Sequence, residues 1–206
     1  MLTEKGQSIE DASMQVIENE IGAHNYNEKE WPIVRRVIHS TADFDFAREN
    51  AIIFHKDAIE SGLNVLKSGC SIVVDVNGVV GLLNKQNSKN FGNNIVCKIS
   101  DPEVRQQAQK ENRTRSQMSM RIASSDIDGG IVVIGNAPTA LLEVIQMIKE
   151  NVVKPTLVIG MPVGFISAAE SKEELAKMDV PFITNKGRKG GSPSVAAIVN
   201  ALYKLI

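Results

Sequence analysis

The sequence predicts a single-domain α/β protein with a mostly parallel central sheet and helices on both faces. Short, continuously apolar runs such as Ser71 to Val76 (SIVVDV) and Ile131 to Ile134 (IVVI) are typical of parallel strands covered on both faces. Segments with helical periodicity alternate with such runs, and this alternation indicates a doubly wound sheet. A chain of 206 residues can bury a core without disulfide bonds, so residues 1–206 are predicted to form one domain.

The first half of the chain begins with two predicted helices. Ile9 to Ile21 has apolar residues at helical spacing and is followed by Gly22. The helix that starts at Trp31 repeats apolar residues at spacings of one, three and four, with Pro32 suited to its first turn. Further predicted helices cover Lys56 to Lys67, the segment VNGVVGLL after Asp75, and the segment from Asp101 through Gln109; strands are predicted at Ala51 to Phe54, Ser71 to Val76 and Ile95 to Ile99.

In the second half, three predicted strands each run into a turn that contains glycine, followed by a helix. The strands are Ile131 to Ile134, Thr156 to Ile159 and Val180 to Thr184, and the last helix is Val195 to Ile206. Asn136 is predicted to cap the helix after the first turn, and Ser192 the helix after the third. Glycines let backbone N–H groups approach an anion at the positive end of a helix, so these turns are candidate anion sites. The basic loop 185–193 is either such a site or only a mobile tip.

Composition excludes several classes of protein. The net charge is −1 and the charges are evenly spread, which argues against a nucleic-acid partner. The polar N-terminus has no signal-peptide core, and no apolar run approaches the roughly twenty residues that span a membrane. Cys70 and Cys97 are predicted to be buried thiols in a reducing cytoplasm, and no spacing of ligands predicts a metal site.

His39 is the candidate catalytic residue. It falls at the end of the Trp31 helix, where the chain turns polar, and an imidazole there can exchange protons near neutral pH. A lone histidine at a helix end is more often an ordinary surface residue, so this position gains weight only from the rest of the chain. His24 and His55 are predicted to be structural.

Several other polar residues have both a structural and a functional interpretation. Asp75, at a strand end, is either a cap for the following helix or part of a site floor. Arg113 and Arg115 form a solvated basic turn, or they bind carboxylates of a common acidic ligand. Ser13 is a tolerated polar residue or a hydrogen-bond donor to a ligand. Together these features are typical of a site for a large polyanion with His39 as its titrating group.

Four motifs carry a resemblance to a known family. RRVIHSTADFDFA, GNAPTAL, GMPVGFISAAESK and GRKGGSPSVAAIVNAL, in this order, resemble precorrin-8X methylmutase (precorrin isomerase), including its cobalt-precorrin-8 relatives. The resemblance covers essentially the whole chain. It implies a homodimeric isomerase of cobalamin biosynthesis that needs no added cofactor. Such an enzyme moves a methyl group from C-11 to C-12 of an acidic tetrapyrrole, giving hydrogenobyrinic or cobyrinic acid.

The resemblance also implies roles for individual residues. His39 matches the general acid/base, and Asp43 or Asp45 would orient its imidazole and raise its pKa. Arg115 matches an arginine for a substrate carboxylate, with Arg113 as a helper. The substrate-binding residues expected in total are Ser13, Thr41, Asp75, Asn77, Gly78, Arg113, Arg115, Gly135, Asn136, Gly164, Gly191 and Ser192.

Two other functions stay open. A nucleotide-binding Rossmann-like enzyme is disfavoured because the GNAPTA turn lacks two glycines of the dinucleotide fingerprint. A non-catalytic corrinoid carrier would bind the product without forming it. The sequence leaves open whether the substrate contains cobalt, with a slight preference for the cobalt form from IHSTADFDFA. The short segment before Ile9 departs from the longer start expected of the family.

Overall fold

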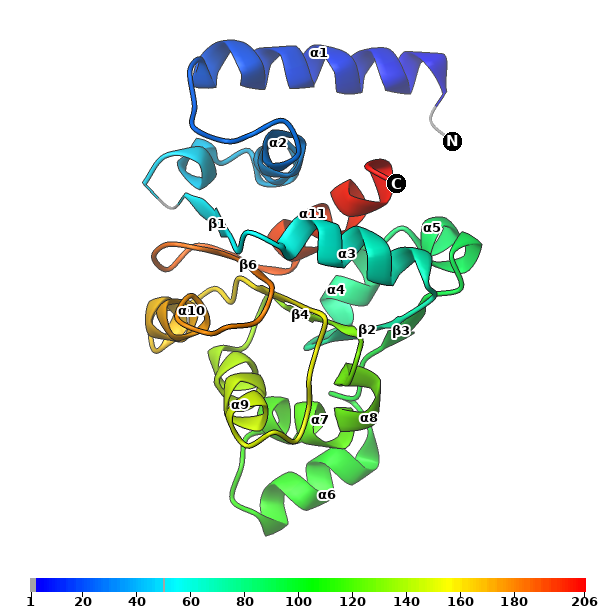
Figure 1. The fold of residues 1–206 in the computed structure, drawn as a ribbon, viewed down its shortest axis with the longest axis vertical. Helices are drawn as coiled ribbons and strands as arrows, with labels where there is room; N and C mark the ends of the chain where they lie inside the picture. Colours follow the sequence, from blue (N-terminus) through cyan, green and yellow to red (C-terminus); the bar gives the residue numbers. More distant parts are fainter. Residues whose placement is uncertain (1–2, 50) are drawn as a thin grey trace.

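The structure, a computed structural model, describes residues 3–49 and 51–206. Met1, Leu2 and Asn50, which belong to the predicted domain and in part to the polar N-terminal segment, lie outside the described residues. Six strands form one sheet in the order β1-β6-β5-β4-β2-β3 (Figure 1). They are β1 (Ile52–Phe54), β2 (Ser71–Val74), β3 (Asn94–Val96), β4 (Ile131–Ile134), β5 (Leu157–Gly160) and β6 (Phe182–Asn185). Only β1 is antiparallel to its neighbour, which confirms the predicted mostly parallel sheet.

Helices cover both faces of the sheet, as predicted (Figure 1). On one face lie α1 (Glu4–Ile21), α2 (Glu30–Thr41), α3 (Ala58–Lys67), α4 (Asn77–Leu82), α5 (Lys85–Asn90) and α11 (Ser192–Lys204), with the short 3-10 helix η1 (Phe44–Ala47) after α2. On the other lie α6 (Pro102–Lys110), α7 (Arg115–Ile122), α8 (Ser124–Ile127), α9 (Pro138–Lys149) and α10 (Ala168–Leu175).

The strands divide their side chains between two apolar cores. In β4, Ile131 and Val133 pack with the residues of α2 and α11, whereas Val132 and Ile134 pack with those of α9. Successive strand residues point to opposite faces, so a strand whose every residue is apolar fills both cores. All four β4 residues are completely buried.

Some element boundaries differ from prediction. Helix α1 begins at Glu4, five residues before Ile9, because the hydroxyl of Thr3 accepts the N–H of Gly6 and caps the helix. Ile9 itself is 59% exposed, so it does not belong to a buried stripe. The polar helix α5 has no apolar periodicity and was not predicted. Cys70 and Cys97 are half-buried free thiols, less enclosed than expected.

Candidate active site

Helix α2 places His39 at the edge of the core that lies between the sheet and helices α2 and α11. Ile33, Val34, Val37 and Ile38 are buried, and this side of α2 packs against α11. His39 lies in the last turn of the helix, as predicted, and its side chain is half-buried. The two other histidines have partners inside the fold: His24 stacks on Trp31 at 3.9 Å, and Nδ1 of His55 accepts the N–H of Asp57.

His39 lies between two cavities and is the residue they share. One, of about 320 Å³, is lined by residues of α1, α2 and α11 together with Leu82. The other, of about 340 Å³, lies between α1 and the end of α2 and includes Ser13 and Phe44. The imidazole is therefore accessible from two sides to a ligand that covers both cavities.

Three charged residues from three helices act on His39: Glu10 and Arg36 line the first cavity, and Lys204 binds Glu10. Oε1 of Glu10 on α1 lies 2.8 Å from Nη1 of Arg36 and 2.7 Å from Nζ of Lys204. Burial is the largest influence on His39 and lowers its pKa below the ordinary value of 6.5; Arg36 also lowers it, whereas Glu10 opposes the shift. His39 is consequently a neutral imidazole at pH 7.

The prediction that Asp43 or Asp45 orients His39 and raises its pKa is wrong. Both carboxylates bind Nζ of Lys189, at 2.8 Å and 2.6 Å, and Asp43 also accepts the N–H of Asp45. The pKa of His39 is lowered, and the carboxylate that acts on it is that of Glu10. The chain after α2 turns away through Ala42 in a left-handed conformation.

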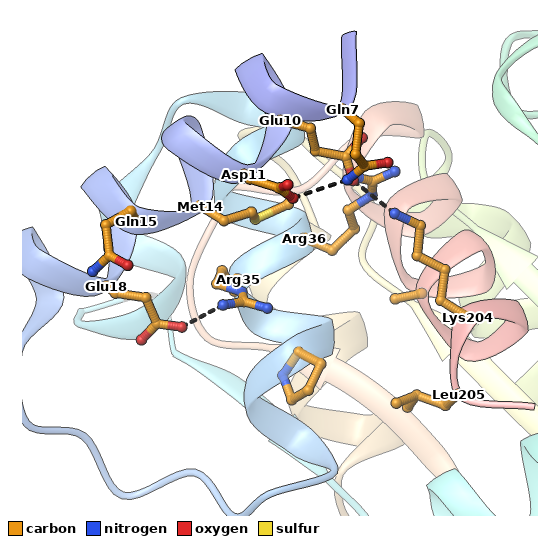
Figure 2. Close-up of a pocket in the computed structure, with 12 residues that line it drawn as sticks. Gln7, Glu10, Asp11, Met14, Gln15, Glu18, Arg35, Arg36, Lys204 and Leu205 are labelled. Carbon is orange, nitrogen blue, oxygen red and sulfur yellow. Dashed lines mark hydrogen bonds and ion pairs between the residues drawn. The ribbon is translucent and has the colours of Figure 1, made fainter. Parts of the chain in front are cut away.

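A further cavity of about 430 Å³ continues from the His39 cavity between α1, α2 and α11 (Figure 2). The two share Glu10 and Arg36. Figure 2 shows Glu10 directed at Lys204, and Glu18 of α1 directed at Arg35 of α2. Ion pairs join α1 to its neighbours at this cavity, and Met14, Ile17 and Ile21 of the same helix pack against the core.

Two predicted substrate-binding hydroxyls lie near His39. Ser13 lines the second cavity, and its hydroxyl donates to the carbonyl of Ile9 one turn earlier. The hydroxyl of Thr41 similarly donates to the carbonyl of Val37. In this state both protons are used within their own helices, and the hydroxyl oxygens retain acceptor capacity.

The three glycine-containing turns meet at the carboxyl edge of the sheet. The N–H of Val163 donates to Gly135, and the N–H of Gly191 donates to Met161. A Cβ atom at Gly135 would lie 3.0 Å from the backbone of Gly191, so glycine permits this contact. Gly78 on α4 and Ser192 on α11 are also neighbours. The fold thus brings together Gly78, Gly135, Asn136, Gly164, Gly191 and Ser192.

The predicted capping role of Asp75 is wrong. The side chain is completely buried and accepts N–H groups from Gly135, Asn136 and Ala137 at 3.2, 2.8 and 2.8 Å. It does not cap α4, which has no side-chain cap. The amides of the first glycine turn are therefore bound to Asp75, and they are not the open anion cradle that the sequence predicted. Asp75 therefore stabilises this turn by accepting its backbone N–H groups.

The other predicted caps also shift. Ala137 rather than Asn136 precedes α9, and Gly191 rather than Ser192 precedes α11; neither helix has a side-chain cap. The side chain of Asn136 is consequently exposed. Asn77 donates to Ser100 at 2.9 Å, which links the start of α4 to the segment after β3.

The two predicted arginines have different surroundings. Arg113 binds the buried Glu143 (3% exposed) at 2.9 Å and also lies 3.4 Å from Glu111. It is therefore paired within the fold and not free to assist Arg115 in binding a substrate carboxylate, as was expected. Arg115 is exposed and lines a cavity of about 630 Å³ with Arg105. This cavity lies at α7, on the α9 face of the sheet, whereas His39 lies on the α11 face. Within a single chain, Arg115 and His39 therefore line different cavities.

Sequence reasoning missed Glu10, Arg36 and Lys204 around His39. Glu10 precedes Ser13 by three residues, and Arg36 precedes His39 by three. This spacing places each pair on one helix face and was a signal in the sequence. Lys204 is 194 residues from Glu10, and only the fold joins them.

The described part of the chain contains neither a cluster of possible metal ligands nor a helix that could cross a bilayer. Over residues 3–49 and 51–206, no three His, Cys, Asp or Glu side chains are grouped so that they could hold a metal ion. Within the same residues, none of the helices combines the length and apolarity needed to cross a membrane.

Fold and site together define a single-domain α/β protein with a histidine between two cavities at the sheet edge. Comparison with known proteins gives its family. A sequence model of precorrin-8X methylmutase matches residues 8–205, and the chain belongs to this family. It is therefore a methylmutase of cobalamin biosynthesis, an isomerase that catalyses an intramolecular methyl shift.

Relatives match along nearly their whole length. A cobalt-precorrin-8 methylmutase of Priestia megaterium is 52% identical over 98% of this chain and 88% of its own length. That of Leptospira interrogans is 43% identical over 99% of this chain and 96% of its own. A crystal structure of precorrin-8x methyl mutase from Thermus thermophilus has a TM-score of 0.89 at 39% identity, covering 97% of this chain and 96% of its own. The family predicted from the motifs is confirmed.

Proposed function

We propose that the chain moves a methyl group from C-11 to C-12 of an acidic tetrapyrrole, with His39 as general acid/base. The observation that carries the proposal is that His39 borders two cavities at once. Each cavity is smaller than a tetrapyrrole, so a flat macrocycle covers both and has the imidazole beneath it. A catalytic base must lie within hydrogen-bond reach of the proton it takes.

The lowered pKa of His39 sets its starting state. A neutral imidazole accepts a proton first and returns it afterwards. Because an isomerisation leaves the composition of the substrate unchanged, a single residue that takes and returns one proton suffices. Once His39 has taken a proton from the macrocycle, it places that proton on a ring nitrogen or meso carbon, which lowers the barrier as electron density builds there. A positioned acid/base of this kind contributes about 10²–10⁴-fold in rate.

We propose that the acidic arms of the macrocycle are bound by the polar residues at the carboxyl edge of the sheet. Ser13 and Thr41 lie beside His39, and Asn77, Gly78, Asn136, Gly164, Gly191 and Ser192 come from the turns. Asp75 acts indirectly, through the turn that it supports. Arg113 stabilises the fold through its ion pair with Glu143. Arg115, which is exposed, is the arginine that binds a substrate carboxylate.

The substrate is proposed to be the cobalt form, cobalt-precorrin-8. The relatives named for that substrate include one at 52% identity, whereas three relatives named precorrin-8X methylmutase are 34%, 36% and 39% identical. Turnover of both forms at equal concentration tests this assignment, and faster turnover of the cobalt-free form contradicts it. Cobalt would enter inside the macrocycle, so the protein needs no metal ligands of its own.

We further propose a homodimer in the cytoplasm, where the thiols of Cys70 and Cys97 stay reduced. Phe165 and Ile166, on the turn after β5, are 87% and 85% exposed. Exposed apolar side chains of this size, adjacent in the chain, are typical of an interaction surface. In a dimer, the Arg115 that binds the substrate would come from the other copy of the chain. This accounts for the separation of Arg115 and His39 within one chain.

Replacement of His39 tests the proposed chemistry. The variant His39→Ala should retain tetrapyrrole binding and lose turnover by about 10²–10⁴-fold. His55→Ala, which removes a histidine outside these cavities, is the matched control. Binding is followed by quenching of protein fluorescence, and turnover by the absorption spectrum of the product. Wild-type turnover by His39→Ala would contradict the acid/base role while leaving the family assignment intact.

A further inference from the structure

Lys172 on α10 is a lysine that the fold has taken almost entirely out of water. Its relative exposure is 1%, and among the described residues no carboxylate pairs with it. Its Nζ donates instead to Oδ1 of Asn185 at 3.1 Å and to the carbonyl of Lys189 at 2.7 Å. Burying an ammonium group is costly unless hydrogen bonds compensate, so this position requires an explanation beyond packing.

The acceptors of Lys172 are Asn185, the last residue of β6, and Lys189 in the basic loop that follows this strand. Nδ2 of Asn185 donates to the carbonyls of Lys186 and Lys189 at 2.8 and 3.0 Å. At Gly190, where φ is 158°, a Cβ atom would lie 2.1 Å from the carbonyl oxygen of Met161. The loop is thus fixed by a buried polar network on its inner side and by close backbone contact with the turn after β5.

The outer side of the same loop holds the end of α2. The side chain of Lys189 binds Asp43 and Asp45, which follow α2 directly. Beyond the loop, the carbonyl of Pro193 accepts the hydroxyl of Ser40 at 3.4 Å, next to His39. Two contacts, one from Lys189 in the loop and one from Pro193 at the start of α11, therefore reach the end of α2, at residues that closely follow His39.

We propose that Lys172 is a positioning residue for the methyl shift: it fixes loop 186–191 from inside, so that Lys189 and Pro193 hold the end of α2 and with it His39. The inference rests on the proposed role of His39. Lys172 does not touch the His39 cavities and takes no part in proton transfer. Its effect passes through Lys189 and the two carboxylates.

Displacement of a catalytic group by about 1 Å lowers the rate by as much as about 10²-fold. Lys172→Met, which keeps the length of the side chain and removes the donor, should therefore lower kcat by about 10- to 100-fold, with a much smaller change in KM. Lys189→Met should lower kcat similarly. Because both act along one path, the double variant should be no worse than the more impaired single variant. Lys177→Met, an exposed lysine shortly after the same helix, is the control and should keep wild-type kcat.

The double-mutant cycle separates positioning from a merely structural role. Multiplicative loss of kcat in the double variant, or wild-type kcat in folded Lys172→Met, overturns the proposal. If Lys172→Met does not fold, two variants replace it: Lys172→Gln, which keeps a donor, and Lys189→Met at the surface. Wild-type kcat in Lys189→Met then overturns the proposal. His39→Ala is measured alongside. An inactive His39→Ala with active lysine variants refutes only this inference, whereas an active His39→Ala refutes the proposed function.

Discussion

Glu10 and Arg36 form an ion pair of 2.8 Å between α1 and α2, at the border of the cavity that contains His39. Lys204 joins the same carboxylate from α11. Two cations and one carboxylate therefore act on the imidazole, and burial acts in the same direction as the cations. The balance keeps His39 neutral at pH 7, which is the state that a proton acceptor requires.

Replacing Glu10 should shift that balance further. Glu10→Gln removes the one influence that raises the pKa of His39 and leaves the charges of Arg36 and Lys204, so the pKa should fall further. Arg36→Gln should raise it. NMR titration of the imidazole signals, with His39 assigned through His39→Gln, measures both variants. The acid limb of kcat/KM should move with the measured pKa, and movement of the two in opposite directions would contradict the role of His39.

Arg115 should contribute to substrate binding rather than to stability. Arg115→Ala removes an exposed guanidinium that forms no ion pair with the other described residues, and affinity for the acidic tetrapyrrole should weaken by about 1–3 kcal/mol. The loss should shrink at high salt, because screening weakens exposed charge pairs. Lys110→Ala, at the end of α6, is the control. Equal affinity of Arg115→Ala and wild type at low salt would show that Arg115 does not bind the substrate.

Asp75 should stabilise the fold. Asp75→Ala leaves the N–H groups of Gly135 and Ala137, both buried, without their acceptor. Each buried donor left unpaired costs about 1–3 kcal/mol, so the free energy of unfolding should fall by several times the effect of an ordinary surface change. Urea denaturation measures it, with Asp179→Ala, at an exposed position, as comparison. An unchanged denaturation midpoint would mean that the turn does not depend on Asp75.

Lys172 should make stability depend on alkaline pH. Burial lowers its pKa from 10.5 to about 8 in the folded chain. Between these values the unfolded chain binds the additional proton, so wild-type stability should rise from pH 8 toward 10.5. The gain relative to Lys172→Met should be at most about 3 kcal/mol. Urea denaturation of both proteins at pH 7.5 and 9.5 measures the difference, and parallel pH profiles would contradict the lowered pKa.

The exposed turn after β5 should determine the oligomeric state. Phe165→Asp together with Ile166→Asp places charges on the proposed interface, and light scattering should show the mass falling from two chains to one. Val152→Asp, which alters an apolar side chain 51% exposed elsewhere, should leave the mass unchanged. A wild-type protein that is a single chain at micromolar concentration would refute the homodimer.

The sequence by itself determined the alternation of strands and helices, and the position of His39 at a helix end. Apolar periodicity acts over a few residues, and the strands of an α/β sheet show it clearly because both of their faces are buried. The four motifs also identified the family. The caps were less predictable: Asn136 and Ser192 are ordinary capping residues, yet Ala137 and Gly191 occupy the positions where the helices begin.

Only the tertiary structure decided which polar groups meet. Asp75 binds the turn at Asn136, Lys189 binds Asp43, and Glu10 binds Lys204, over separations of 61, 146 and 194 residues. No local pattern encodes such pairs, because each forms only when the packing of apolar faces has brought its helices and turns together. The same packing separated Arg115 from His39, on opposite faces of one sheet.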